Sequence, residues 1–174
     1  PYQQYVKLES DARFYRYLGG EKQFIIRLNP GVGIPYGNSD VLTFEKNFYA
    51  GGSSGVRAWQ ARTLGPGSYN RSSLGLGLRA DSLRTNLRNL DQLGEIKFEG
   101  NLEYRFKLMD NFFSSKVKGA TFTDFGNVWK LRQDIATPGG EFKFNKLLTD
   151  LAIGAGAGLR FDLNYFVFRL DAGL

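Results

Sequence analysis

Arg57 is the side chain whose setting most suggests specific chemistry. It lies in the stretch YAGGSSGVRAW, residues 49–59, where glycines and serines change abruptly to Val-Arg-Ala-Trp. A segment so rich in glycine cannot hold an arginine in place by itself, so groups elsewhere in the chain must receive it. Carboxylates suit this role, because the planar guanidinium can donate two parallel hydrogen bonds to one carboxylate and reach a second with its remaining donors.

Composition argues against most catalytic chemistry. The chain of 174 residues has no cysteine and no histidine, which excludes disulfide frameworks, the usual zinc sites and nucleophiles that use histidine as a base. We therefore expect no enzymatic activity, no metal and no other cofactor. The formal charge of +6 comes from basic residues interleaved with acidic ones, so we also expect no nucleic-acid partner.

The elements that must position these charged groups are strands. In residues 96–108 the even positions are mostly apolar and the odd positions are charged or polar, which is typical of a strand with two different faces. Apolar parity switches across Asn164 and Tyr165, which predicts a tight turn between antiparallel strands. Further strands are expected at residues 3–18, 23–37, 116–129 and 151–163.

Strand length favours a membrane-spanning sheet. Strands of soluble proteins commonly have about 5 to 6 residues, whereas a tilted strand needs about 9 to 11 to cross the hydrocarbon core. Residues 96–108 are long enough, and aromatic residues near the strand ends resemble the girdles of membrane barrels. A soluble antiparallel sheet with its apolar face on a core is the alternative, which alternation alone does not exclude.

Residues 37–94 are expected to form one long and mostly irregular loop. Glycine, serine and asparagine dominate much of this segment. A short alternating piece, residues 73–81, is ambiguous between strand and loop.

The sequence GAGAG, residues 154–158, superficially resembles a phosphate-binding loop. The dinucleotide fingerprint requires a third glycine where Leu159 stands, followed by a helix. Here the glycines alternate within an expected strand, so we interpret them as leaving room on its inner face.

Two carboxylates are candidate receivers for Arg57. The sequence GNLEYRF places Glu103 on the charged face of its strand, and FTDFGNVW, residues 122–129, contributes Asp124. The alternative is an exposed loop arginine surrounded by water.

With these residues considered together, the sequence resembles the barrel of the BamA/TamA superfamily of outer-membrane assembly proteins, also called the bacterial surface antigen family. In that family a long extracellular loop folds back into the barrel lumen, and its Val-Arg-Gly-aromatic tip bonds to the Asp of a Phe-x-Asp-x-Gly strand. The matching residues of tip and strand are Val56, Arg57, Trp59, Phe122, Asp124 and Gly126. The segments DQLGEIKFEGNLEYRF and GLRFDLNYFVFRLDAG add to the resemblance, which covers nearly the whole chain.

The resemblance implies that Asp124 receives Arg57 inside the barrel and that Glu103 lies close enough to share it. Ala58 departs from the family pattern, which has glycine there. If that position requires a positive φ, alanine carries a cost of about 1 kcal/mol.

The implied fold is all-β: residues 1–174 would be the C-terminal fragment of an antiparallel transmembrane β-barrel of the bacterial outer membrane, in contact with outer-membrane lipid. We expect about six strands, a missing closing strand, and residues 37–94 directed into the lumen. Two open sheet edges would result, and these would meet further strands of the natural protein or pair with another copy.

The function implied by the resemblance is non-enzymatic assembly. The clients would be unfolded β-barrel proteins or secreted polypeptides, and edge strands of an openable barrel can template an incoming strand. The sequence leaves open whether periplasmic or lipoprotein partners take part. Two other functions remain, namely a passive outer-membrane pore, for which a lumen-filling loop has little use, and the membrane anchor of a patatin-like lipase fused N-terminally.

Overall fold

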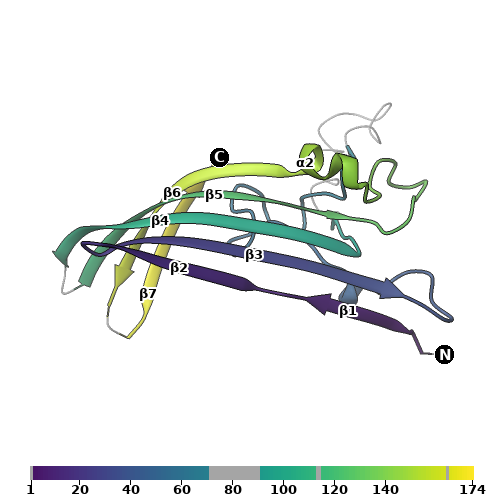
Figure 1. Ribbon diagram of the computed structural model, residues 1–174, viewed down its shortest axis with the longest axis horizontal. Coiled ribbons are helices and arrows are strands. Elements are labelled where there is room, and N and C mark those ends of the chain that lie inside the picture. The colour runs from purple at the N-terminus through teal and green to yellow at the C-terminus, as the bar shows by residue number, and fades with distance from the viewer. Residues whose placement is uncertain (1, 71–90, 113–114, 164) are drawn as a thin grey trace, which may run out of the picture.

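The strands of the protein form one curved antiparallel sheet (Figure 1). The computed structural model describes residues 2–70, 91–112, 115–163 and 165–174. The strands are β1 (Tyr5–Glu9), β2 (Ala12–Gly19), β3 (Lys22–Pro35), β4 (Ile96–Phe112), β5 (Ser115–Trp129), β6 (Ala152–Asp162) and β7 (Val167–Gly173). Short helical turns are η1 (Phe44–Lys46), η3 (Phe144–Lys146) and α2 (Leu147–Asp150). Within these described ranges, no helix is long and apolar enough to cross a membrane.

The sheet has the order β1-β3-β4-β5-β6-β7, and β2 pairs with β3 on the same edge as β1. The single strand expected at residues 3–18 is therefore two strands, interrupted at residues 10 and 11. Proline explains the break: Ser10 donates its backbone N–H to the Pro30 carbonyl at 3.0 Å, but Pro30 has no N–H to donate in return. The Asn29 side chain replaces the missing donor and binds the Ser10 carbonyl at 2.7 Å.

The two faces of the sheet follow the alternation seen in the sequence. Strand β4 is continuous over residues 96–108, as predicted, and extends to Phe112. Its odd residues Lys97, Glu99 and Glu103 are buried beneath the connection that follows β3. Its even residues lie on the opposite face together with those of β3, which pair with them at Phe24↔Tyr104 and Ile26↔Leu102.

The β6–β7 hairpin confirms the predicted turn. Phe161 pairs with Phe168 and Asp162 with Val167, so the register is symmetric about a point between residues 164 and 165. The Leu163 N–H donates to the Phe166 carbonyl at 3.1 Å, which closes the turn. Residue 164 itself lies outside the described residues.

The two ends of the sheet differ in the length of their connections. Those from β2 to β3, β4 to β5 and β6 to β7 are short, whereas β3 to β4 and β5 to β6 are joined by residues 36–95 and 130–151. Both long connections leave the right-hand end in Figure 1. Since transmembrane barrels have short periplasmic turns and long extracellular loops, this end corresponds to the extracellular side.

The connection after β3 supplies most of the buried core. Its described residues, 37–70 and 91–94, are irregular apart from η1 and two isolated bridges, as expected, and the ambiguous residues 73–81 lie outside the described part. The core cluster joins this connection to one strand residue and consists of Phe48, Ala50, Val56, Leu64 and Val128. The core therefore lies on the polar face of the sheet.

Most of the apolar face of the sheet is left uncovered. Ile153 is 66% exposed and Phe168 51% exposed, and both lie on strands with long apolar alternation. A soluble sheet would bury this face and expose the polar one. The arrangement is the inverse, which is what a bilayer requires.

Leu102 tests the assignment of the two faces. We expect Leu102→Arg to cost about 2 to 4 kcal/mol of unfolding free energy in lipid vesicles, because the charge enters hydrocarbon. Tyr15→Arg is the matched control, since Tyr15 pairs with Ile25, which pairs with Glu103 on the polar face, and is 47% exposed. Denaturant titration in vesicles measures both, and similar costs for the two variants would contradict the assignment.

Candidate functional site

The segment before Arg57 turns back on itself at two glycines. Gly51 and Gly52 have φ values of 91° and 88°, a conformation that side chains rarely adopt. Gly52 donates its N–H to the Trp59 carbonyl at 2.8 Å, and Trp59 donates to the Val56 carbonyl at 3.1 Å. The glycines thus close a compact loop tip, residues 51–59, that presents Arg57 to the strands.

Arg57 binds Asp124 with both its side chain and its backbone. Its Nε and Nη2 donate to the two oxygens of Asp124 at 2.7 and 2.8 Å, and its backbone N–H donates to Oδ2 at 3.0 Å. Its Nη1 donates to Oε2 of Glu103 at 2.8 Å. The guanidinium carbon also lies 3.4 Å from the centre of the Phe122 ring, a cation–π contact. The structure thus brings Arg57 together with Glu103 and Asp124.

Burial makes these bonds strong. The side chain of Arg57 is 6% exposed and that of Asp124 is 0% exposed. Burial by itself disfavours the charged guanidinium, but the hydrogen bonds to Asp124 and Glu103 outweigh it, so the pKa of Arg57 is raised. Arg57 therefore stays cationic, and removing a partner would leave an unpaired buried charge.

The remaining predicted residues shape the seat of the loop tip. An added Cβ at Gly126 would lie 3.0 Å from Val56 Cγ2 and 2.8 Å from the Phe98 carbonyl, so only glycine leaves room for Val56. Val56 is fully buried, and the partly buried Trp59 packs against the same cluster. Asn101 donates to both Asp124 and the Gly55 carbonyl, at 2.8 and 2.7 Å, which joins strand β4 to the tip.

Ala58 fits its position without backbone strain. The non-glycine residues with positive φ among the described ranges are Glu21 and Arg62, so the expected cost at Ala58 does not arise. Instead Gly154 of β6 makes space, since an added Cβ there would lie 2.5 Å from the Ala58 Cβ. The alternating glycines of GAGAG do face inward, as interpreted from the sequence.

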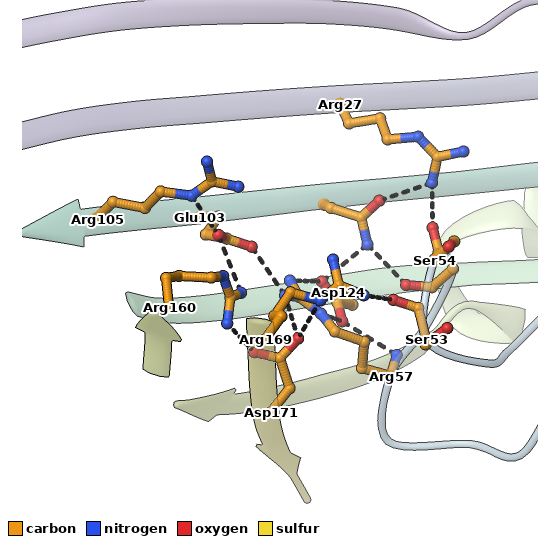
Figure 2. A network of polar contacts seen from close by, with 12 residues as sticks. Arg27, Ser53, Ser54, Arg57, Glu103, Arg105, Asp124, Arg160, Arg169 and Asp171 are labelled. Carbon is orange, nitrogen blue, oxygen red and sulfur yellow. Dashed lines mark hydrogen bonds and ion pairs between the residues drawn. The ribbon is translucent and has the colours of Figure 1, made fainter. Parts of the chain in front are cut away.

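Four further charged residues extend the site, and the sequence analysis missed them (Figure 2). The additional residues are Arg105, Arg160, Arg169 and Asp171. Arg160 binds Glu103 at 3.2 Å and Asp171 at 2.5 Å, and Asp171 lies 3.5 Å from Arg57. Asp171 lies on the inward face because it pairs with Gly158, a register that only the structure reveals.

We call these residues the arginine network: Arg57, Arg105, Arg160, Arg169, Glu103, Asp124 and Asp171. It connects the loop tip to β4, β5, β6 and β7, since each of these strands contributes at least one member. Arg169 adds a bond to the tip backbone at the Ser53 carbonyl, 2.7 Å away. Among the described residues, no group of His, Cys, Asp or Glu side chains is arranged to hold a metal ion. The arginine network can therefore hold the loop tip, residues 51–59, against the strands.

Comparison with known proteins identifies the family. The model of the Omp85 superfamily domain matches residues 2–174, nearly the entire chain. The chain belongs to the Omp85 superfamily. It is therefore a bacterial outer-membrane protein of a family that assembles or translocates proteins at that membrane.

A solved structure shares the fold of this Omp85 chain. It is the crystal structure of BamA from Haemophilus ducreyi lacking POTRA domains 1–3, with a TM-score of 0.70 and 15% sequence identity. The alignment covers 98% of this chain and 31% of that chain, so the Omp85 chain spans about a third of the length of the BamA structure.

The bond between Arg57 and Asp124 can be measured by a double-mutant cycle. Arg57→Ala and Asp124→Ala each leave a buried charge unpaired, so each should weaken loop anchoring by about 3 to 5 kcal/mol, and the double variant by less than their sum. Amide hydrogen exchange at residues 51–59 reports the anchoring. Arg132→Ala is the control, because Arg132 is 71% exposed in its ion pair with Asp40. Strict additivity would contradict the coupling.

The seat of Ala58 gives an independent prediction. Gly154→Ala should displace the loop tip and cost about 1 to 3 kcal/mol, because the new methyl group overpacks against Ala58 and Trp59. Adding Ala58→Gly should recover part of the loss. Ala155→Val, on the uncovered face, should have little effect in the same exchange measurement. No rescue by the second substitution would show that the contact is unimportant.

Proposed function

We propose that residues 1–174 are the C-terminal part of an outer-membrane barrel that inserts β-barrel proteins into the membrane or moves polypeptides across it. The clients are unfolded barrel proteins or secreted polypeptides, and the role is non-enzymatic. The family and the fold support this proposal at the level of the class.

The observation that carries the proposal is the anchored loop tip. A passive pore needs an open lumen, whereas here residues 51–59 are fixed on the inward face by four hydrogen bonds from the Arg57 guanidinium and one from its backbone. Burying the charges of this anchor costs desolvation free energy, and a freely conducting channel would gain nothing from it. This favours an assembly role over the pore.

The proposed way of receiving a client is strand pairing. The edge strands of a barrel that can open offer main-chain hydrogen bonds to an incoming strand, which is how a client strand would be received.

Client assembly and conductance, measured on the same full-length protein, test the function. In vesicles, Arg57→Ala should lower the yield of folded, protease-protected client several-fold and raise ion conductance, because the released tip no longer fills the lumen. Arg57→Lys should give an intermediate result, since lysine cannot form the two-pronged bond.

Arg132→Ala is the control for a general effect of removing an arginine, and it should match the parent protein in both assays. A parent protein that conducts freely and assembles no client would overturn the assembly role in favour of the pore. Normal client yield with Arg57→Ala would show that the anchor is not needed for assembly.

A further inference from the structure

The connection from β5 to β6 folds over the outer, uncovered face of the sheet at its extracellular end. Trp129, the last residue of β5, is fully buried, and its ring meets the Phe142 ring edge-on with centroids 5.7 Å apart. Trp129 Nε1 donates to Oδ2 of Asp150 at 3.3 Å, and Asn127 Nδ2 donates to the Asp150 carbonyl at 2.5 Å. These contacts fix η3 and α2 against the strands.

The apolar surface of the strands continues onto this connection. Phe142 and Leu147 line one groove together with outward-facing strand residues, namely Leu8, Val32, Phe98 and Trp129. Figure 1 shows α2 at the right-hand end of the sheet, where β3 and β5 finish. The helical turns therefore lie where the lipid-facing surface meets the extracellular medium.

Two large apolar side chains project from these turns. Phe144 is 83% exposed and Leu148 is 81% exposed. Phe144 belongs to η3 and Leu148 to α2, and both project to the outside, whereas Leu147 between them lines the groove against the strands. Exposed apolar groups of this size are costly in water but are stable at a bilayer border.

Two lysines accompany the apolar side chains. Lys143 and Lys146 are three residues apart and both exposed. Lys143 lies 2.6 Å from Glu141, but its side chain is 49% exposed, and such surface pairs are weak. Both lysine ammonium groups are therefore able to pair with an anion that binds them more strongly. Lysines next to apolar anchors match the phosphate groups at a membrane surface.

We propose that residues 142–148 form an outer-leaflet anchor. Phe144 and Leu148 enter the border of the acyl chains, and Lys143 and Lys146 bind phosphate groups of the lipid headgroups. The occupant is lipid because the segment continues the lipid-facing surface of the strands and lies at the end where the long connections emerge. The anchor holds the extracellular ends of β4 and β5 at a fixed depth through Trp129 and Asp150.

Insertion can be tested with one labelled cysteine, because residues 1–174 contain none and any cysteine elsewhere in the full-length protein is replaced beforehand. The full-length protein carrying Phe144→Cys is labelled with a fluorescent dye and placed in phosphatidylcholine vesicles with brominated acyl chains. The matched control is Ile135→Cys, on the same connection and 100% exposed. Bromine should quench the dye at position 144 several-fold more than at position 135. Equal quenching at the two positions overturns the proposed insertion.

The lysines are tested in vesicles of phosphatidylcholine with added lipid A carrying two phosphates. Energy transfer from position 144 to labelled lipid A measures its enrichment around the anchor. Lys143→Gln with Lys146→Gln should lower this enrichment by about fivefold per lysine. Lys22→Gln with Lys116→Gln, two exposed lysines at the opposite end, should leave it unchanged. If Lys143→Gln with Lys146→Gln leaves the lipid A enrichment undiminished, the proposed phosphate contact is overturned, whatever the bromine quenching shows.

Discussion

A guanidinium buried on a glycine-rich loop must have its charge neutralised, and this requirement determines where the loop tip lies. Asp124 meets the side chain and the backbone N–H of Arg57 at once, so the position and the direction of the tip are both fixed. The desolvation cost of the two charges is offset because the two side-chain bonds are charge-assisted and short, and the backbone N–H adds a third bond to the same carboxylate. Without such a receiver the glycines would leave the segment free to move.

The rest of the sheet is organised around this polar interior. The core residues Phe48, Val56 and Leu64 belong to the long connection, and they pack on Val128 and on strands that also present charged residues and glycines inward. Glycine is used twice as a seat, at Gly126 for Val56 and at Gly154 for Ala58. The glycines of the strands therefore leave room for the side chains of the loop, and this complementary packing explains how a loop without regular structure is held.

Alternation predicted the strands and their faces because side chains on a strand have a period of two, and this signal is local. It also indicated which side Glu103 occupies, whereas the inward position of Asp124 was implied by the resemblance to the family. Asp171 and Arg160 could not be assigned from the sequence, since their meeting depends on the pairing of β6 with β7 and on the curvature of the sheet. The break between β1 and β2 depends on Pro30, a residue of the neighbouring strand. Interactions that depend on the register between strands cannot be predicted from one sequence segment at a time.

The arginine network links strands that are not neighbours. Arg57 contacts Glu103 of β4, Asp124 of β5 and Asp171 of β7, so its three carboxylate partners lie on three strands of a curved sheet. Flattening the sheet would move β7 away from β4 and separate these carboxylates. The buried guanidinium would then lose partners, at a cost of several kcal/mol. The network therefore stabilises the curvature of the sheet as well as the position of the loop, and the two features support each other.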